Sequence, residues 1–195
     1  MRKLEGIIPP ATTAFDRFGN IDLETCAKQF QWLKNSGCHG LAVGGSTGEG
    51  HTLDRKEFSQ LLASALKEVG SELPIVAGII VNSTQEAIER GKLAKSIGAD
   101  ALQVTPVHYL FRPDDESMIS HFRELAEKTE IPIIIYNVVP WTYLSPNLLC
   151  RILREVPNVI GVKQSAGDMK LLADLLEQSQ SEDLIFTAVD ALLYP

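Results

Sequence analysis

The sequence predicts a (β/α)8 barrel, and three observations carry this prediction. Short apolar runs alternate with longer amphipathic runs along all 195 residues, which is typical of parallel strands covered by helices. The units recur about every 31 residues, the spacing expected when about 250 residues form eight strand-helix units. An open doubly wound sheet is the second choice, because it usually has a glycine-rich phosphate turn after its first strand. Here that turn reads Pro-Pro-Ala-Thr-Thr at residues 9–13, which is not a glycine-rich phosphate turn.

Seven segments read as strands because they are short, apolar and followed by turn residues. They are residues 6–9, 40–44, 74–79, 101–105, 132–136, 159–163 and 183–188. The chain ends soon after the seventh segment, and a barrel without its eighth strand has two unpaired sheet edges. We therefore expect one incomplete barrel domain over residues 1–195, from a fragment or a truncated gene.

The segments between the strands carry helical signals. Apolar residues recur at helical spacing and predict stripes that lie on the sheet. The stripes are Leu23/Ala27/Phe30/Leu33, Phe58/Leu61/Leu62/Ala65/Val69 and Met118/Ile119/Phe122/Leu125. Capping residues and glycines mark helix ends. These are Asp54 with Glu57, Ser83 with Glu86, Ser145 before Pro146, and the terminal glycines Gly70 and Gly98.

Charge and cysteine usage exclude several classes of protein. The formal net charge of −7 argues against a nucleic-acid surface. The three cysteines, Cys26, Cys38 and Cys150, are odd in number and widely spaced, so neither a disulfide framework nor a zinc site is expected. No apolar run is long enough to span a bilayer, and the N-terminus lacks a leader pattern. We expect a soluble, unprocessed protein of the cytoplasm without membrane partners.

Lys163 is the leading catalytic candidate because it closes the apolar run 158–162. A lysine delivered into a protein interior loses hydration, so its pKa falls and a neutral amine nucleophile forms. Such an amine attacks a ketone to give an iminium ion, which draws electrons from neighbouring bonds. Residues at the carboxyl ends of barrel strands face the substrate mouth. The alternative is a lysine that reaches back to water or pairs with a carboxylate.

Tyr136 closes another apolar run, so it is expected to point into the same mouth as Lys163. Its hydroxyl group would carry protons to and from the carbinolamine and the oxygen of the substrate. The alternative is a buried tyrosine that only satisfies a hydrogen bond.

The segment 44–50, Gly-Gly-Ser-Thr-Gly-Glu-Gly, predicts a site for a small carboxylate. Its glycines expose backbone N–H groups, and the hydroxyls of Ser46 and Thr47 stand beside them, directly before Gly48. An ordinary glycine-rich turn explains the same letters. The segment is not a P-loop, because the Gly-Lys-Ser/Thr ending is absent.

The histidines do not predict a metal site. His39, His51, His108 and His121 lack ligand spacing, so we expect a reaction without metal or cofactor. His121 is expected to be structural. His108 and Tyr109 follow the fourth expected strand and could reach the mouth.

These motifs together resemble the dihydrodipicolinate synthase/N-acetylneuraminate lyase family of class I, Schiff-base-forming aldolases. Three stretches carry the resemblance: Gly45-Ser46-Thr47-Gly48-Glu49 followed by Leu53 and Glu57, Tyr136-Asn137-Val138, and Gly161-Val162-Lys163 with Gly167-Asp168. It runs from about residue 6 to the end of the chain, and implies that about the last third of a typical member is missing.

The resemblance also implies roles for individual residues. Lys163 would form the iminium ion with pyruvate or a related 2-oxo acid, Tyr136 would shuttle protons, and Ser46 and Thr47 would hold the carboxylate. Either Tyr109 or His108 would extend the proton relay. Family members are commonly homotetramers, so a homo-oligomer is implied, with the Tyr109 region reaching a neighbouring subunit.

Two departures from the family pattern are visible. In many members Pro-x-Tyr-Tyr places the relay tyrosine two residues after the proline, where this chain has His108 and Tyr109 follows one position later. Dihydrodipicolinate synthases usually carry an arginine shortly after the tyrosine motif to bind the carboxylate of the aldehyde partner. Here residues 138–143 read Val-Val-Pro-Trp-Thr-Tyr, and neither Trp141 nor Thr142 replaces a bidentate guanidinium.

Three functional hypotheses follow. The first is a dihydrodipicolinate synthase-like lyase or aldolase that uses a Lys163 imine. The second is an aldolase or dehydratase that acts on 2-oxo-3-deoxy sugar acids. The third is a truncated, non-catalytic remnant that retains only carboxylate binding or packs with a partner.

Overall fold

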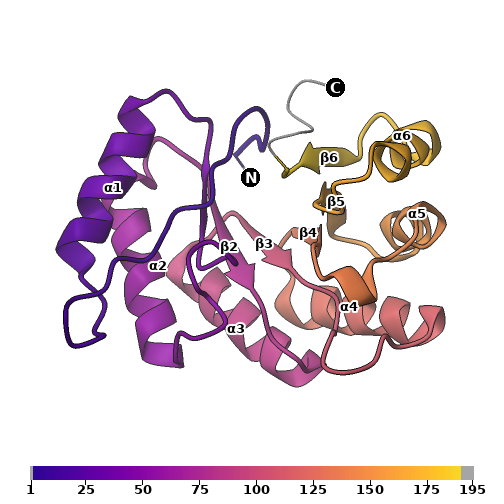
Figure 1. Cartoon of the computed structure of the whole chain (residues 1–195), viewed down its shortest axis with the longest axis horizontal. Helices are drawn as coiled ribbons and strands as arrows, with labels where there is room; N and C mark the ends of the chain where they lie inside the picture. The colour runs from indigo at the N-terminus through magenta and orange to yellow at the C-terminus, as the bar shows by residue number, and fades with distance from the viewer. Residues whose placement is uncertain (1, 190–195) are drawn as a thin grey trace. The chain divides into compact units, whose positions relative to one another are not determined.

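The computed structural model describes residues 2–189, in which helices and strands alternate along the chain (Figure 1). The helices are α1 (Leu23–Asn35), α2 (Arg55–Val69), α3 (Thr84–Ile97), α4 (Asp115–Thr129), α5 (Pro146–Glu155) and α6 (Met169–Gln178), with a 3-10 turn η1 (Pro140–Thr142). The strands are β1 (Leu41–Val43), β2 (Ile75–Ile79), β3 (Ala101–Val104), β4 (Ile133–Asn137), β5 (Val159–Gln164) and β6 (Leu184–Thr187). The last six predicted strands are confirmed, each end within one residue.

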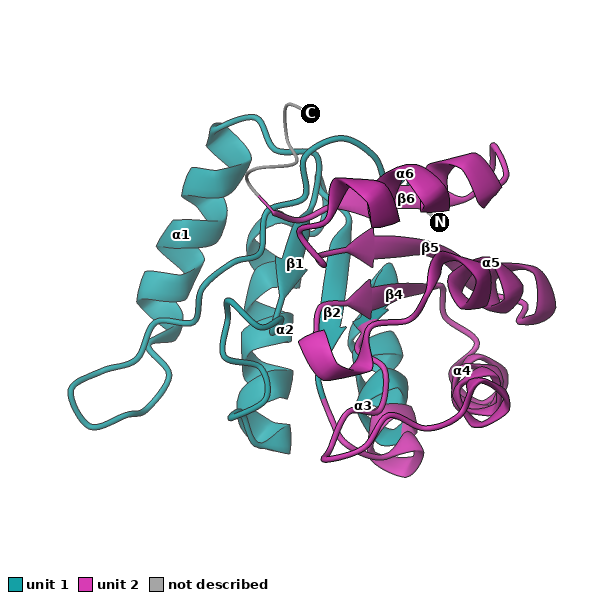
Figure 2. Ribbon diagram, turned by 45° about the vertical axis from the view of Figure 1, so that its right-hand side comes forward, with its two compact units in different colours: residues 1–80, 89–103 teal, residues 81–88, 104–195 magenta. Residues whose placement is uncertain are grey.

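The chain divides into two compact units, which Figure 2 colours separately. Unit 1 comprises residues 1–80 and 89–103, and unit 2 comprises residues 81–88 and 104–195. The expectation of a single domain over residues 1–195 stays a prediction.

Unit 1 is built on the parallel pair β1 and β2. Leu41 pairs with Ile75 and Val43 with Ala77, and both strands are buried along their length. Helix α2 packs on both strands and on α1. The fully buried Phe58 belongs to the apolar stripe predicted for α2, so the helical period places the core as expected.

The predicted strand at residues 6–9 is wrong. In its place the described residues have one isolated bridge, between Pro10 and Ala42. The amide of Ala42 donates to the Pro9 carbonyl at 3.0 Å, and the amide of Ala11 donates to the Ala42 carbonyl at 2.9 Å. Because Pro9 and Pro10 have no N–H groups, this segment cannot continue a regular hydrogen-bond ladder.

Unit 2 is built on three parallel strands with β5 between β4 and β6. The β4–β5 register steps from Ile133 with Val159 to Ile134 with Gly161, so Ile160 is the extra residue of a β-bulge. A Cβ on Gly161 would lie 2.2 Å from the Leu184 carbonyl oxygen. Only glycine therefore fits where β5 passes β6.

The predicted helix ends largely agree with the structure. Asp54 and Glu57 form a reciprocal capping box before α2, with both hydrogen bonds at 2.8 Å. Ser145 caps α5, with Pro146 in the first turn. Ser83 accepts a hydrogen bond from the Glu86 amide, and Gly70 and Gly98 follow the last residues of α2 and α3.

Strand order agrees with the first of the two predicted architectures. In each unit the strands are neighbours in the order in which they occur along the chain. A doubly wound sheet instead reverses direction at a switch point. The sequential order is that of a (β/α)8 barrel. Of the helices described, none has the length and apolar character needed to cross a lipid bilayer.

Candidate active site

Lys163 and Tyr136 lie next to each other near the carboxyl ends of β5 and β4. The two residues pair in register across the parallel strands. The Lys163 Nζ atom lies over the face of the Tyr136 ring, 4.3 Å from its centroid. Tyr136 is buried and Lys163 is half-buried. The structure therefore brings together the two residues that were predicted to lie at the same end of the barrel.

Burial lowers the pKa of Lys163 from 10.5 to about 8. At pH 7 about one amine in ten is then neutral, against about one in three thousand for an ordinary lysine. The cause is the loss of hydration, which disfavours the ammonium form. The negative face of the Tyr136 ring opposes this shift, because it attracts a cation.

Asn137 and Gln164, which sequence reasoning did not single out as site residues, follow Tyr136 and Lys163 and pair with each other. Both side chains are fully buried. The Asn137 Nδ2 atom donates to the Gln164 Oε1 atom at 3.2 Å. Side chains alternate between the two faces of a strand, so this amide pair lies on the sheet face opposite to the amine and the phenol. The signal in the sequence was a polar residue just past each apolar run.

The segment between β3 and α4 contains the other two candidates for the proton relay. The ring of His108 donates from Nδ1 to the Pro106 carbonyl at 3.0 Å, and the His108 carbonyl accepts from the indole of Trp141 at 2.8 Å. Tyr109 is 69% exposed, as are its neighbours Leu110 and Phe111 to a similar degree. Within residues 2–189 no hydrogen bond or ring contact joins Tyr109 to Lys163, so this part of the predicted relay stays a prediction.

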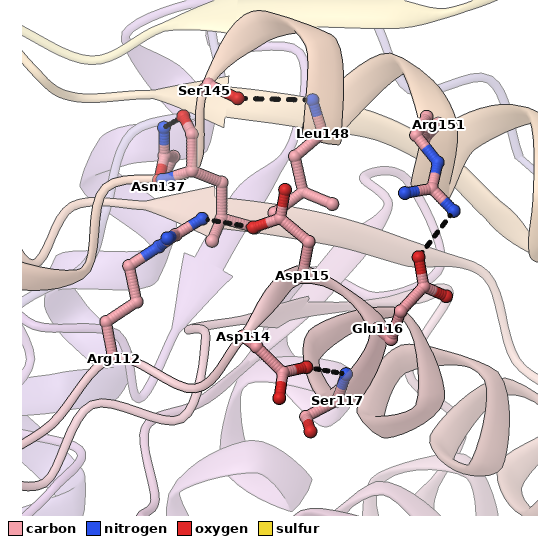
Figure 3. Close-up of polar contacts among 10 residues, drawn as sticks. Arg112, Asp114, Asp115, Glu116, Ser117, Asn137, Ser145, Leu148 and Arg151 are labelled. Atoms are coloured by element: carbon pink, nitrogen blue, oxygen red, sulfur yellow. Dashed lines mark hydrogen bonds and ion pairs between the residues drawn. The ribbon is translucent and has the colours of Figure 1, made fainter.

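Polar contacts fix the chain directly after this exposed stretch (Figure 3). Arg112 pairs with Asp115 at 2.7 Å, and Asp114 caps α4 by accepting from the Ser117 amide at 2.7 Å. Glu116 pairs with Arg151 of α5 at 3.0 Å. The exposed residues 109–111 are therefore followed by a helix start that three polar contacts hold.

The predicted carboxylate-binding segment follows β1 in unit 1. Ser46 and Thr47 are exposed, whereas Gly45 and Gly48 are buried. A buried hydrogen bond holds the loop, because the Thr13 hydroxyl donates to the Gly48 carbonyl at 2.6 Å. This arrangement presents both hydroxyls to solvent on a fixed backbone.

Close backbone packing leaves no room for side chains at Gly48 and Gly50 of this loop. A Cβ on Gly50 would lie 1.8 Å from the Gly44 carbonyl oxygen, and one on Gly48 would lie 2.7 Å from the Ala11 carbonyl oxygen. Arg90 donates to the carbonyls of Gly50 and Leu53 at 3.2 and 3.0 Å. The glycines thus serve the packing of the loop as well as its turn.

His121 is buried, and its Nδ1 atom lies 2.9 Å from the Thr84 hydroxyl. Burial lowers its pKa from 6.5 to about 4, so the ring is neutral near pH 7. Across residues 2–189 no three His, Cys, Asp or Glu side chains gather as metal ligands would. A reaction without metal or cofactor stays a prediction.

Comparison with known proteins identifies the family. The Dihydrodipicolinate synthetase family matches residues 3–195. The 4-hydroxy-tetrahydrodipicolinate synthase of Methanopyrus kandleri is 33% identical over 99% of this chain and 65% of its own length. The enzyme of that name from Pseudomonas aeruginosa is 36% identical over 96% of this chain and 64% of its own length.

Solved structures agree with the sequence comparison. Dihydrodipicolinate synthase from Acinetobacter baumannii, in a complex with pyruvate, has a TM-score of 0.91 and 31% identity over 95% of this chain and 64% of its own. The enzyme from Aquifex aeolicus has a TM-score of 0.91 and 27% identity over 97% of this chain and 64% of its own. The chain thus spans less than two thirds of these relatives and carries the corresponding part of a (β/α)8 barrel, as predicted. With this fold and a family match over residues 3–195, the chain belongs to the dihydrodipicolinate synthetase family.

Proposed function

We propose that this chain forms an imine between Lys163 and pyruvate or a related 2-oxo acid, and that it makes or breaks a bond next to the resulting enamine. The observation that carries the proposal is the half-buried amine, whose pKa falls to about 8, over the Tyr136 ring. The structure from Acinetobacter baumannii, a complex with pyruvate, supports the choice of keto acid.

The proposed chemistry uses the amine as a nucleophile and then as an electron sink. Lys163 adds to the C2 carbonyl, and loss of water from the carbinolamine gives an iminium ion. Removal of a proton from C3 leaves an enamine, which forms a carbon–carbon bond to an aldehyde as the aldehyde oxygen takes up a proton. Water then hydrolyses the iminium ion and returns the amine. Cleavage is the reverse sequence.

The remaining roles are those that the family resemblance implies. Under the proposal the Tyr136 hydroxyl carries the protons of carbinolamine formation and breakdown. The exposed hydroxyls of Ser46 and Thr47, with the Gly48 backbone, bind the carboxylate of the keto acid. Tyr109 or His108 passes protons onward.

The acceptor is the finer question, and the loop from β4 to α5 bears on it. Residues 138–144 contain no cationic side chain, and Trp141 is 63% exposed. An acceptor that carries its own carboxylate, in addition to that of the keto acid, is usually bound by a cationic side chain or by paired hydrogen-bond donors. This observation favours an aldehyde without a carboxylate over an acceptor with one. The aldehydes released when 2-oxo-3-deoxy sugar acids are cleaved belong to the favoured class.

Borohydride trapping tests the imine. We expect reduction in the presence of pyruvate to add the mass of the reduced ligand to the peptide that contains Lys163. Lys163→Met should abolish the adduct, whereas Lys170→Met, which removes an exposed lysine of α6 paired with Asp174, should leave it unchanged. An unmodified Lys163 in folded protein would refute the proposal. Pyruvate binding without an adduct would instead favour the non-catalytic remnant.

The homo-oligomer is likewise a proposal. The exposed apolar side chains of Tyr109, Leu110 and Phe111 support it. Sedimentation of the purified chain measures the state directly, and a monomer at all concentrations would contradict it.

A further inference from the structure

The side chain of Asn137 closes the loop that leaves β4. Its Oδ1 atom accepts from the Leu144 amide at 2.9 Å, and its Nδ2 atom donates to the Leu144 carbonyl at 3.1 Å. An amide side chain that bonds both backbone groups of another residue imitates a strand partner. Loop 138–144 is thereby tied to the strand end, and Ser145 caps α5 directly afterwards, close to Asn137 (Figure 3).

Gln164 holds the end of β5 in a similar way. Its Oε1 atom accepts from the side chain of Asn137 at 3.2 Å and from the Ala166 amide at 3.2 Å. The Ser165 amide adds a backbone bond of 3.2 Å to the Asn137 carbonyl. The two amides therefore join both strand ends and both loops that leave them, and the hydrogen bond between the two side chains is buried.

The amide pair and the candidate catalytic pair are one residue apart in register. Tyr136 pairs with Lys163, and Asn137 pairs with Gln164. The backbone of each strand end thus carries the phenol or the amine on one face and an amide on the other. A slip or twist of one strand end against the other would move the Tyr136 ring relative to the Lys163 Nζ atom. The hydrogen bond between the Asn137 and Gln164 side chains resists that movement.

We propose that Asn137 and Gln164 are positioning residues that hold the Tyr136 ring over the amine of Lys163. They act through the strand ends and do not touch the substrate. This inference deepens the proposed function, and so its catalytic meaning rests on it. Its geometry, however, is tested without any substrate.

Lysine NMR gives a direct test, because an aromatic ring shifts the signal of a group held over its face. The protein is labelled with 13C-lysine, and the ε-methylene signal of Lys163 is assigned by its loss in Lys163→Met. Tyr136→Leu gives the position of this signal without the ring. We expect Asn137→Leu and Gln164→Met to shift the signal toward that position.

The double variant and a control sharpen the result. Because the two amides share one bond, the double variant should shift the signal no further than the sum of the single variants, and most of the effect should already appear in Asn137→Leu. Leu149→Ala removes a fully buried side chain of α5 in the same unit. It should lower the unfolding temperature and leave the Lys163 signal in place.

Folded Asn137→Leu and Gln164→Met proteins with the wild-type signal would overturn the inference and leave the amides a purely structural role. If Asn137→Leu fails to fold, Gln164→Met decides alone, since it removes only the bonds from Asn137 and Ala166. Because no keto acid is present, a failure here is distinct from a failure of borohydride trapping.

Discussion

The loop after β1 and the ends of β4 and β5 hold their candidate groups in opposite ways. In the loop, backbone packs on backbone, and the space is so small that a Cβ on Gly50 would overlap the Gly44 carbonyl. At the strand ends, side-chain amides do the holding, through the buried bond between Asn137 and Gln164. The conformation of the loop therefore requires glycines that have no Cβ atom. The arrangement of the strand ends requires a side-chain donor on one strand and an acceptor on the other.

This difference separates two kinds of substitution. Added volume should damage the loop even when it brings no polar atom, because the neighbouring backbone cannot move aside. At the strand ends a change of a donor into an acceptor should be harmful even when the volume is unchanged.

The largest effect is expected for Gly50→Ala. The new methyl group would lie 1.8 Å from the Gly44 carbonyl oxygen, and we expect a loss of about 4 kcal/mol in the free energy of unfolding. Gly37→Ala is the control, because its φ of +84° is strained but nothing lies within 4 Å of the new atom. It should lose only about 1 kcal/mol. Urea unfolding measures both, and equal losses would mean that volume is not the limit in the loop.

Asn137→Asp tests the strand ends at constant volume. The acid keeps an acceptor for the Leu144 amide but turns the Nδ2 donor into an oxygen that faces the Leu144 carbonyl and Gln164 Oε1. We expect a loss of about 3 kcal/mol in unfolding free energy at pH 7.

The pH dependence of this variant identifies the cause. Burial raises the pKa of the new carboxyl group in the folded state above its unfolded value, so the folded state binds the proton more tightly. The deficit relative to wild type should therefore shrink as the pH falls toward the unfolded pKa. Asn137→Leu should show a deficit without this recovery. Parallel deficits in both variants would contradict the donor argument.

The two regions also differ in what the sequence could predict. Lys163 and Tyr136 were found because each closes an apolar run, and the carboxyl ends of parallel strands meet at one edge. The Asn137–Gln164 bond was not predicted, because its partners are 27 positions apart and meet only through the bulge at Ile160. A register slip of one residue would place both amides on the other face, and no local pattern announces the bulge.

The fold shows the same limit. Six strands were predicted to within one residue at each end, because the alternation of short apolar runs with longer amphipathic runs shows which segments are buried. The segment 6–9 was also apolar, but Pro9 and Pro10 withhold the donors that a ladder needs. Apolar character predicts where a segment lies, and hydrogen-bonding capacity decides whether it pairs.

Acid should affect unit 2 through His121. Its pKa of about 4 in the folded state lies below the ordinary value of 6.5, so the unfolded state binds the proton more tightly. Stability is therefore complete above about pH 6.5 and falls as the pH drops toward 4, with about 2 kcal/mol lost by pH 5. His121→Leu should remove most of this slope. An unchanged slope in urea unfolding between pH 7 and pH 5 would assign the acid sensitivity to other groups.

The smallest effect concerns Thr13, where the loop does depend on a hydrogen bond. Thr13→Val keeps the shape but removes the buried donor to the Gly48 carbonyl, and we expect a loss of about 1 kcal/mol in unfolding free energy. Thr13→Ser keeps the hydroxyl and should lose less. Under the proposed function, Thr13→Val should also weaken pyruvate binding in calorimetry, because Gly48 adjoins Ser46 and Thr47. Weaker binding without a loss of stability would mean that Thr13 sets the loop conformation, and that even the tightly packed loop relies on one donor to aim its hydroxyls.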